Sequence, residues 1–136
     1  MLSVMIWLPL VGALVVFLVS RVSEKAAKLL TLLVSGATLV LALTIFVSYS
    51  QEKVGFQMVE SFAWAESFGL TFTLGIDGIS LPLLIISALL TTLATAGSWR
   101  EIHSSIGPYY ALLLLFEGAI IGVFTSLNLI LFYVFW

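Results

Sequence analysis

Long apolar runs without charge divide the chain into segments of membrane-spanning length. Residues 2–20, 29–50 and 78–99 contain no charged side chain. Each run is close to the roughly 20 residues that an α-helix needs to cross the hydrocarbon core of a bilayer. The pattern therefore predicts three membrane-spanning helices over these residues, in an all-α integral membrane protein.

The last apolar segment is too long for one ordinary span and too short for two. From residue 104 to 136 only Glu117 is charged, and the most polar, turn-like point is residues 125–128. We predict an inner loop at 100–107, a fourth span at 108–125 and the start of a fifth at 127–136. A helix ending at residue 136 would leave carbonyls unpaired in hydrocarbon, so we expect the sequence to stop inside a helix. The alternative is one long tilted helix over 107–136.

The basic residues predict the orientation of the spans. Three of the five lie between the first two spans, and Arg100 lies between the third and fourth; only Lys53 falls in the other loop. Loops rich in Lys and Arg stay on the cytoplasmic side, which places Met1 outside. We interpret Lys25 and Lys28 as charges that set this topology.

The outer loop, residues 51–76, contains two alternating segments. From Phe56 to Trp64 every second residue is large or acidic, and alternation resumes from Gly69 to Leu74 after a polar break at 65–67. This period of two predicts a β-hairpin between the second and third spans, resting on neighbouring protein or on the membrane interface. The alternative is an irregular loop with interfacial Trp and Phe anchors.

The composition excludes several classes of protein. Hydrophobic residues make up 62% of the 136 residues and charged residues 9%, with a mean hydropathy of +1.24. A soluble domain is about one quarter charged, so the composition excludes a soluble globular protein. Five Lys and Arg are too few for a protein that binds nucleic acid. With no Cys and one His, the chain lacks the residues for an iron–sulfur cluster, a thiolate nucleophile or a multi-His metal site.

Glu117 is the candidate for chemistry. It stands near the centre of the fourth predicted span, where a carboxyl group is costly to bury. A carboxyl that can be neutral or charged near pH 7 is suited to proton transfer. The alternative is a permanently protonated, structural glutamic acid.

Few other residues are candidates for a functional role beside Glu117. Gly118 and Gly122 form a G-x-x-x-G pair that predicts close helix packing inside the protein. Tyr110 shares a helix face with Glu117, but at a distance that only water could bridge. His103, in the inner loop, is a weaker candidate for proton entry. Asp77, which opens the third span, is explained by helix capping.

Three blocks of sequence resemble a known family. They are LGIDGISL at 74–81, YYAL at 109–112 followed by EGAIIGVF at 117–124, and LILFYVFW at 129–136. In this order they resemble helices three to five of subunit M (chain 4) of respiratory NADH:quinone oxidoreductase, complex I. The related antiporter-like proton-translocating subunits include those of multisubunit cation/proton antiporters, membrane-bound hydrogenases and coenzyme-F420 dehydrogenases.

The resemblance implies an antiporter-like fold of about fourteen helices with inverted repeats, of which this chain would supply the N-terminal helices. Glu117 matches a position that is often acidic in the family, whereas Asn128 stands where aspartate is common. The family's principal glutamate would follow Trp136, and its partner lysine lies later still, so neither is carried over. The chain itself would bind no cofactor or metal, and FMN, iron–sulfur clusters and quinone would belong to partner subunits.

The resemblance implies a non-redox subunit of a translocase, not catalytic by itself, that moves protons as NADH or a related donor reduces quinone. Its partners would be other antiporter-like and membrane subunits and the lipid bilayer. Its place would be a bacterial or archaeal plasma membrane, or an organellar inner or thylakoid membrane. The alternatives are a subunit of a multisubunit Na⁺/H⁺ antiporter or a membrane-bound hydrogenase, and a non-conducting structural fragment.

Overall fold

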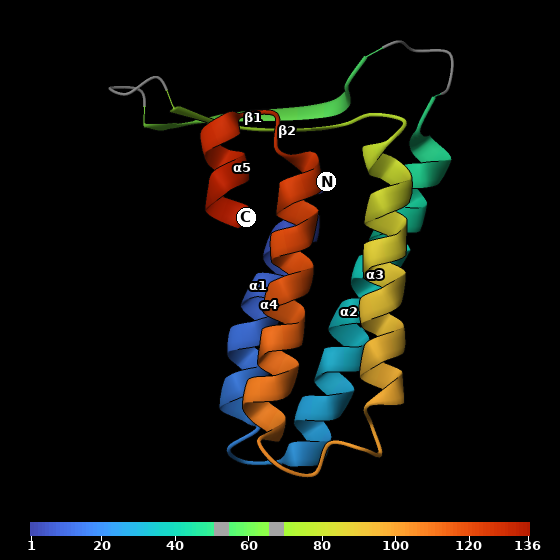
Figure 1. Ribbon diagram of the computed structural model, residues 1–136, viewed down its shortest axis with the longest axis vertical. Coiled ribbons are helices and arrows are strands. Elements are labelled where there is room, and N and C mark those ends of the chain that lie inside the picture. The colour runs from blue at the N-terminus through green and yellow to red at the C-terminus, as the bar shows by residue number, and fades with distance from the viewer. Residues whose placement is uncertain (51–54, 66–69) are drawn as a thin grey trace.

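Four long helices lie side by side, and a two-stranded sheet crosses one end of them (Figure 1). The computed structural model describes residues 1–50, 55–65 and 70–136. Each long helix is long and apolar enough to cross a membrane. The helices are α1 (Leu2–Val19), α2 (Glu24–Ser48), α3 (Ser80–Gly97) and α4 (Ile106–Thr125). The predicted all-α membrane fold with a hairpin between the second and third spans is confirmed.

Two helices begin earlier than the predicted spans. α2 begins at Glu24 and not at residue 29, after Ser23, whose hydroxyl accepts a hydrogen bond from the Ala26 N–H (3.3 Å). α4 begins at Ile106 and not at 108, because Pro108 fits the first turn of a helix, where no amide hydrogen is needed. The absence of charge locates the hydrocarbon layer, whereas a helix can continue into the interface beyond it.

The fourth apolar segment is two helices, so the alternative of a single tilted helix is wrong. α4 ends at Thr125, and the extended link after it pairs with the sheet, where the Leu127 N–H donates to the Thr73 carbonyl (2.9 Å). Asn128 then caps a short helix, α5 (Leu129–Phe135), by accepting from the Ile130 N–H (2.9 Å). α5 folds back along α4 (Figure 1).

The outer loop forms the predicted hairpin, which excludes the irregular-loop alternative. β1 (Gln57–Ala65) pairs antiparallel with β2 (Leu70–Ile76), and Phe62 faces Phe72 across the ladder. The ladder shifts register between Gln57 and Glu60, where Met58 has a positive φ of 52°. This bulge interrupts the alternation seen in the sequence. Residues 51–54 and most of the predicted polar break, residues 66–67, lie outside the described residues.

The two ends of the bundle differ in character. At the hairpin end, Leu74 and Ile76 of β2 are buried in a core with α1, α2 and α3. The opposite end carries the loops between α1 and α2 and between α3 and α4 (Figure 1). We call it the basic end, after the cationic side chains in or beside these loops, which are Arg21, Lys25, Lys28 and Arg100.

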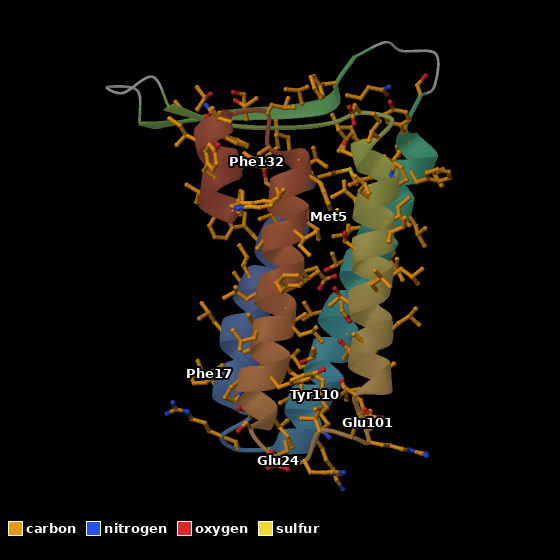
Figure 2. All side chains as sticks on the ribbon, viewed as in Figure 1. Met5, Phe17, Glu24, Glu101, Tyr110 and Phe132 are labelled. Atoms are coloured by element: carbon orange, nitrogen blue, oxygen red, sulfur yellow. The ribbon has the colours of Figure 1, made fainter. Side chains whose placement is uncertain are left out.

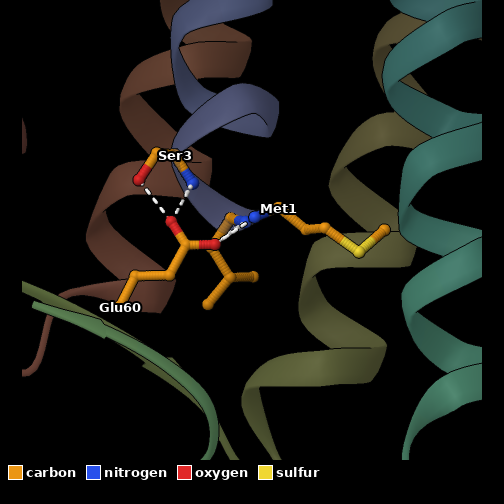
Figure 3. A network of polar contacts seen from close by, with 4 residues as sticks. Met1, Ser3 and Glu60 are labelled. Atoms are coloured by element: carbon orange, nitrogen blue, oxygen red, sulfur yellow. Dashed lines mark hydrogen bonds and ion pairs between the residues drawn. The ribbon is translucent and has the colours of Figure 1, made fainter.

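Glu60 of β1 ties the hairpin to the start of α1 (Figure 3). Its carboxylate accepts from the backbone N–H groups of Leu2 (2.9 Å) and Ser3 (3.1 Å), from the Ser3 hydroxyl and from the Met1 ammonium group. The first N–H groups of a helix have no partner within the helix, so a carboxylate there is favourable. Partial burial alone would raise the pKa of Glu60, but these bonds and the ammonium charge outweigh it and lower the pKa to about 2.

Replacing Glu60 should loosen the hairpin. We expect Glu60→Gln to weaken its attachment to α1 by about 1–3 kcal/mol, because a charged acceptor is lost, and hydrogen exchange of the Leu2, Ser3 and β2 amides to become faster. Because the pKa falls from 4.5 to about 2 on folding, the contribution should be complete above pH 4.5 and decline as the pH falls toward 2. Val59→Ala, at an exposed neighbour with an apolar side chain, is the control; equal protection in both variants would contradict the role of Glu60.

Candidate functional site

Glu117 lies inside the bundle and not toward lipid. Its side chain is 0% exposed, and neither carboxyl oxygen has a hydrogen-bond partner among the described residues. A buried carboxylate without a partner is strongly unfavourable. The group must therefore be neutral, or be solvated for part of the time.

Two glycines of α4 mark close helix contacts. A Cβ on Gly118 would lie 2.8 Å from Leu10 Cγ and 3.2 Å from the Ile6 carbonyl oxygen of α1, and one on Gly122 would overlap the Phe135 ring of α5. Gly118 therefore sets α4 tightly against α1. Because consecutive residues lie about 100° apart around a helix, Glu117 lies to the side of this contact with α1.

Tyr110 shows which helices Glu117 faces. Seven residues separate the two, so they lie within about 20° on one face of α4. Tyr110 is buried, its hydroxyl accepts from the Ser98 hydroxyl (3.2 Å), and its ring lies under the Lys28 ammonium group (6.0 Å to the ring centroid). Figure 2 shows Tyr110 toward the basic end, the end at which Glu24 and Glu101 also lie. Glu117 therefore points toward α2 and α3.

The facing surfaces of α2 and α3 carry buried hydroxyl groups. On each helix they recur every three or four residues, which is one face. Those described are Thr31, Ser35 and Thr38 on α2, and Thr91, Thr95 and Ser98 at the end of α3. Most donate to a carbonyl of their own helix, as Thr38 does to Val34 (3.0 Å). Their oxygens keep lone pairs that can still accept.

Lys28 does more than the sequence indicated. It is buried, and its ammonium group donates to the carbonyls of Trp99 (2.7 Å) and Ile102 (2.9 Å), just beyond the end of α3. A cation is favourable there because the last carbonyls of a helix lack partners and carry partial negative charge. One sequence signal was available: Lys28 precedes Thr31, Ser35 and Thr38 on the same helical face.

The other sequence candidates lie apart from Glu117. His103 is exposed in the loop at the basic end. Asp77 caps the start of α3 by accepting from the N–H groups of Ile79 (3.1 Å) and Ser80 (2.7 Å). The hydrogen bond from the Ser80 N–H is the main reason that the pKa of Asp77 is lowered. No group of three or more metal-ligating side chains occurs within residues 1–50, 55–65 and 70–136.

Curated relatives align with almost the whole chain. An F(420)H(2) dehydrogenase subunit M from Methanosarcina mazei is 33% identical over 134 residues, 98% of this chain and 27% of the relative. An NADH-quinone oxidoreductase subunit M from Rickettsia conorii is 35% identical over 138 residues, 98% and 28%. An NAD(P)H-quinone oxidoreductase chain 4 1 from Picosynechococcus sp. is 37% identical over 129 residues, 94% and 24%. No family model matches the chain.

A solved structure gives the fold. A chain in the structure of the Mrp complex from Dietzia sp. DQ12-45-1b superimposes with a TM-score of 0.81 and 20% identity, over 99% of this chain and 14% of that one. The resemblance to subunit M or chain 4 is confirmed by the curated relatives, and the antiporter-like helix arrangement by the structure. The chain spans about a quarter of the length of those relatives.

The contact at Gly118 can be tested with a matched glycine. We expect Gly118→Ala to destabilise the protein by about 1–3 kcal/mol, because the added methyl group meets Leu10 and the Ile6 backbone. Gly36→Ala, where a Cβ meets nothing within 4 Å, should be neutral or slightly stabilising. Thermal unfolding of the assembled protein in detergent measures both, and equal midpoints for the two variants would rule out a close α1–α4 contact.

Proposed function

We propose that this chain, which is similar to subunit M or chain 4 of NADH-quinone oxidoreductases, belongs to an antiporter-like subunit that translocates protons as a donor reduces quinone. The observation that supports this is the enclosed carboxyl group of Glu117, which has no hydrogen-bond partner among the described residues. Ionisable groups within membrane spans are costly and mark ion pathways. Glu117 would form an O–H bond when it takes up a proton and break that bond when it passes the proton on.

The chain acts in this proposal as a non-redox subunit. FMN, iron–sulfur clusters and quinone would be held by partner subunits, which would include sister antiporter-like chains. The names of the relatives include both NADH- and F(420)H(2)-dependent complexes, so we propose NADH or a related donor. Met1 and the hairpin end would face outward, since the two connecting loops, in or beside which Arg21, Lys25, Lys28 and Arg100 stand, lie at the opposite end.

A second candidate function is a subunit of a cation/proton antiporter without redox partners. The superposition on a chain of an Mrp complex favours it, because that likeness extends over 99% of this chain. Proton flux that depends on a cation and needs no electron donor would support this function. Co-purification with flavin and iron–sulfur subunits would support the first function, proton translocation coupled to quinone reduction.

Neutralising Glu117 should uncouple proton movement from electron transfer. Glutamine keeps the shape of the side chain but cannot release a proton. In the complete complex we therefore expect Glu117→Gln to lower the number of protons translocated per electron pair by the share that this subunit carries among its sister antiporter-like chains, with little change in donor oxidation by uncoupled membranes. Proton uptake by sealed vesicles measures the translocation, and the rate of donor oxidation measures the electron transfer.

The control is Glu101→Gln, an exposed glutamate at the basic end, which should pump normally. A stable Glu117→Gln complex that pumps at the wild-type ratio would contradict the proposal and leave Glu117 a structural residue.

A further inference from the structure

A groove opens on the outside of the bundle at the basic end, where α2 lies beside the end of α3 (Figure 1). It has a volume of about 380 Å³, and the residues that line it are Leu32 of α2 and Ala96, Gly97, Trp99 and Arg100 at the end of α3 and just beyond it. Ala96, Gly97 and Arg100 are exposed, and both helices are apolar enough to span a membrane. The groove therefore opens toward lipid and not toward the interior of the bundle.

The inner part of this α2–α3 groove is apolar and unfilled. A Cβ on Gly97 would meet no atom within 4 Å, and Ala96 beside it carries only a methyl group. Leu32 lines the groove from α2. Space that protein leaves open beside a membrane helix is filled by lipid, because an empty gap forfeits dispersion contacts. This part of the groove can therefore hold an acyl chain.

Three hydrogen-bond donors stand at the end of the groove nearest the membrane surface. Arg100 and Trp99 line it. Lys25 precedes Leu32 by seven residues, so it lies on the same face of α2, about 10 Å nearer the basic end. Within the described part of the chain, the Arg100 guanidinium group, the Lys25 ammonium group and the Trp99 indole N–H have no partner. All three can therefore donate to an acceptor from outside the chain, and the two cations favour an anion.

The end of α3 by itself would repel an anion, because the last carbonyls of a helix carry partial negative charge. Lys28 offsets that charge, since its ammonium group donates to the carbonyls of Trp99 (2.7 Å) and Ile102 (2.9 Å). The acids at this end are Glu24 and Glu101, against four basic residues in or beside the two loops. An anion beside the end of α3 therefore meets a field that is positive on balance.

Charge distinguishes this groove from others on the bundle. Four grooves of about 400–520 Å³ are lined, among the described residues, by uncharged side chains alone, so they do not distinguish an acyl chain from a partner's helix. In the α2–α3 groove an apolar helix would cover Arg100 without supplying a counter-charge, which is costly. An anionic phospholipid satisfies both parts of the groove, with its acyl chain in the apolar part and its phosphate at the cations.

We propose that the α2–α3 groove binds an anionic phospholipid. The phosphate accepts from Arg100, whose planar guanidinium group matches phosphate oxygens with paired hydrogen bonds, and from the Trp99 indole, a typical anchor at this depth. Lys25 adds a second positive charge. The acyl chain lies along Leu32 and Gly97, so the lipid joins α2 to α3 from the outside. The site goes beyond the proposed function and does not depend on proton transfer.

Photo-crosslinking in the complete complex tests the site. The complex is placed in phosphatidylcholine vesicles with a trace of probe lipid, which carries a diazirine in its acyl chain and either a phosphatidylglycerol or a phosphatidylcholine head group. Mass spectrometry of peptides locates the label. We expect the phosphatidylglycerol probe to label Leu32 and residues 96–97 about fivefold more than the phosphatidylcholine probe, or better, since one basic residue near the surface favours an anionic lipid by about this factor.

Filling the groove should displace the lipid. Gly97→Leu places a side chain in open space, so the fold should be retained, and we expect labelling of Leu32 by the phosphatidylglycerol probe to be lost. Ala37→Leu is the matched control. Ala37 is exposed on α2 and, five residues after Leu32, lies about 140° from it around the helix, so this variant should be labelled like the wild type.

Removing one charge should lower the preference without closing the groove. We expect Arg100→Gln to reduce the ratio of phosphatidylglycerol to phosphatidylcholine labelling by about fivefold, while the phosphatidylcholine probe still reacts. The control is Arg21→Gln, which removes a cation at the same end. The Arg21 guanidinium group lies over the Phe17 ring of α1 (5.1 Å to the centroid) and does not line the groove, so the ratio should not change.

Equal labelling of the wild type by the two probes would overturn the proposal, because the groove would then hold surrounding lipid of any head group. Absence of label from both would overturn it as well, since a neighbouring subunit would then cover the groove. A preference that survives both Gly97→Leu and Arg100→Gln would place the anionic lipid elsewhere and refute this site.

Discussion

A carboxyl group within a bilayer must be enclosed by protein, because hydrocarbon offers it neither water nor a hydrogen-bond partner. The bundle satisfies this constraint at Glu117. Gly118 brings α4 against α1, which closes one side of the helix and turns the carboxyl toward α2 and α3. The hydroxyl groups on those two helices then provide a polar surface that lipid could not.

The same constraint explains why the two ends of the bundle are built differently. At the hairpin end, Glu60 accepts from the free amides of α1, and β2 covers an apolar core. At the basic end, Lys28 donates to the carbonyls beyond α3, and hydroxyl groups continue inward from it. One end has a carboxylate at the start of a helix, and the other end has a cation at the end of a helix. Both are favourable, because a helix carries partial positive charge at its start and partial negative charge at its end.

The similarity to much longer relatives gives this arrangement its context. The chain aligns over nearly its whole length with about a quarter of subunit M of an F(420)H(2) dehydrogenase and of an NADH-quinone oxidoreductase. Glu117 nevertheless lies within the helices described here, and its surroundings come from α1 to α4. The proposed role of Glu117 in proton movement therefore rests on contacts within this chain.

Much of the fold follows from the sequence alone, because hydrocarbon thickness sets the length of an uncharged span and a period of two is incompatible with a helix. Charge-free runs located the first three long helices, and an apolar run with a single acid located the fourth and drew attention to Glu117. A polar cluster located the turn near Asn128, and alternation located the hairpin. Three features depended on tertiary structure: the direction in which Glu117 points, the burial of Lys28 and the attachment of Glu60 to α1. Each depends on which helix faces which, and one helix's sequence carries its own periodicity but not the register of its neighbours.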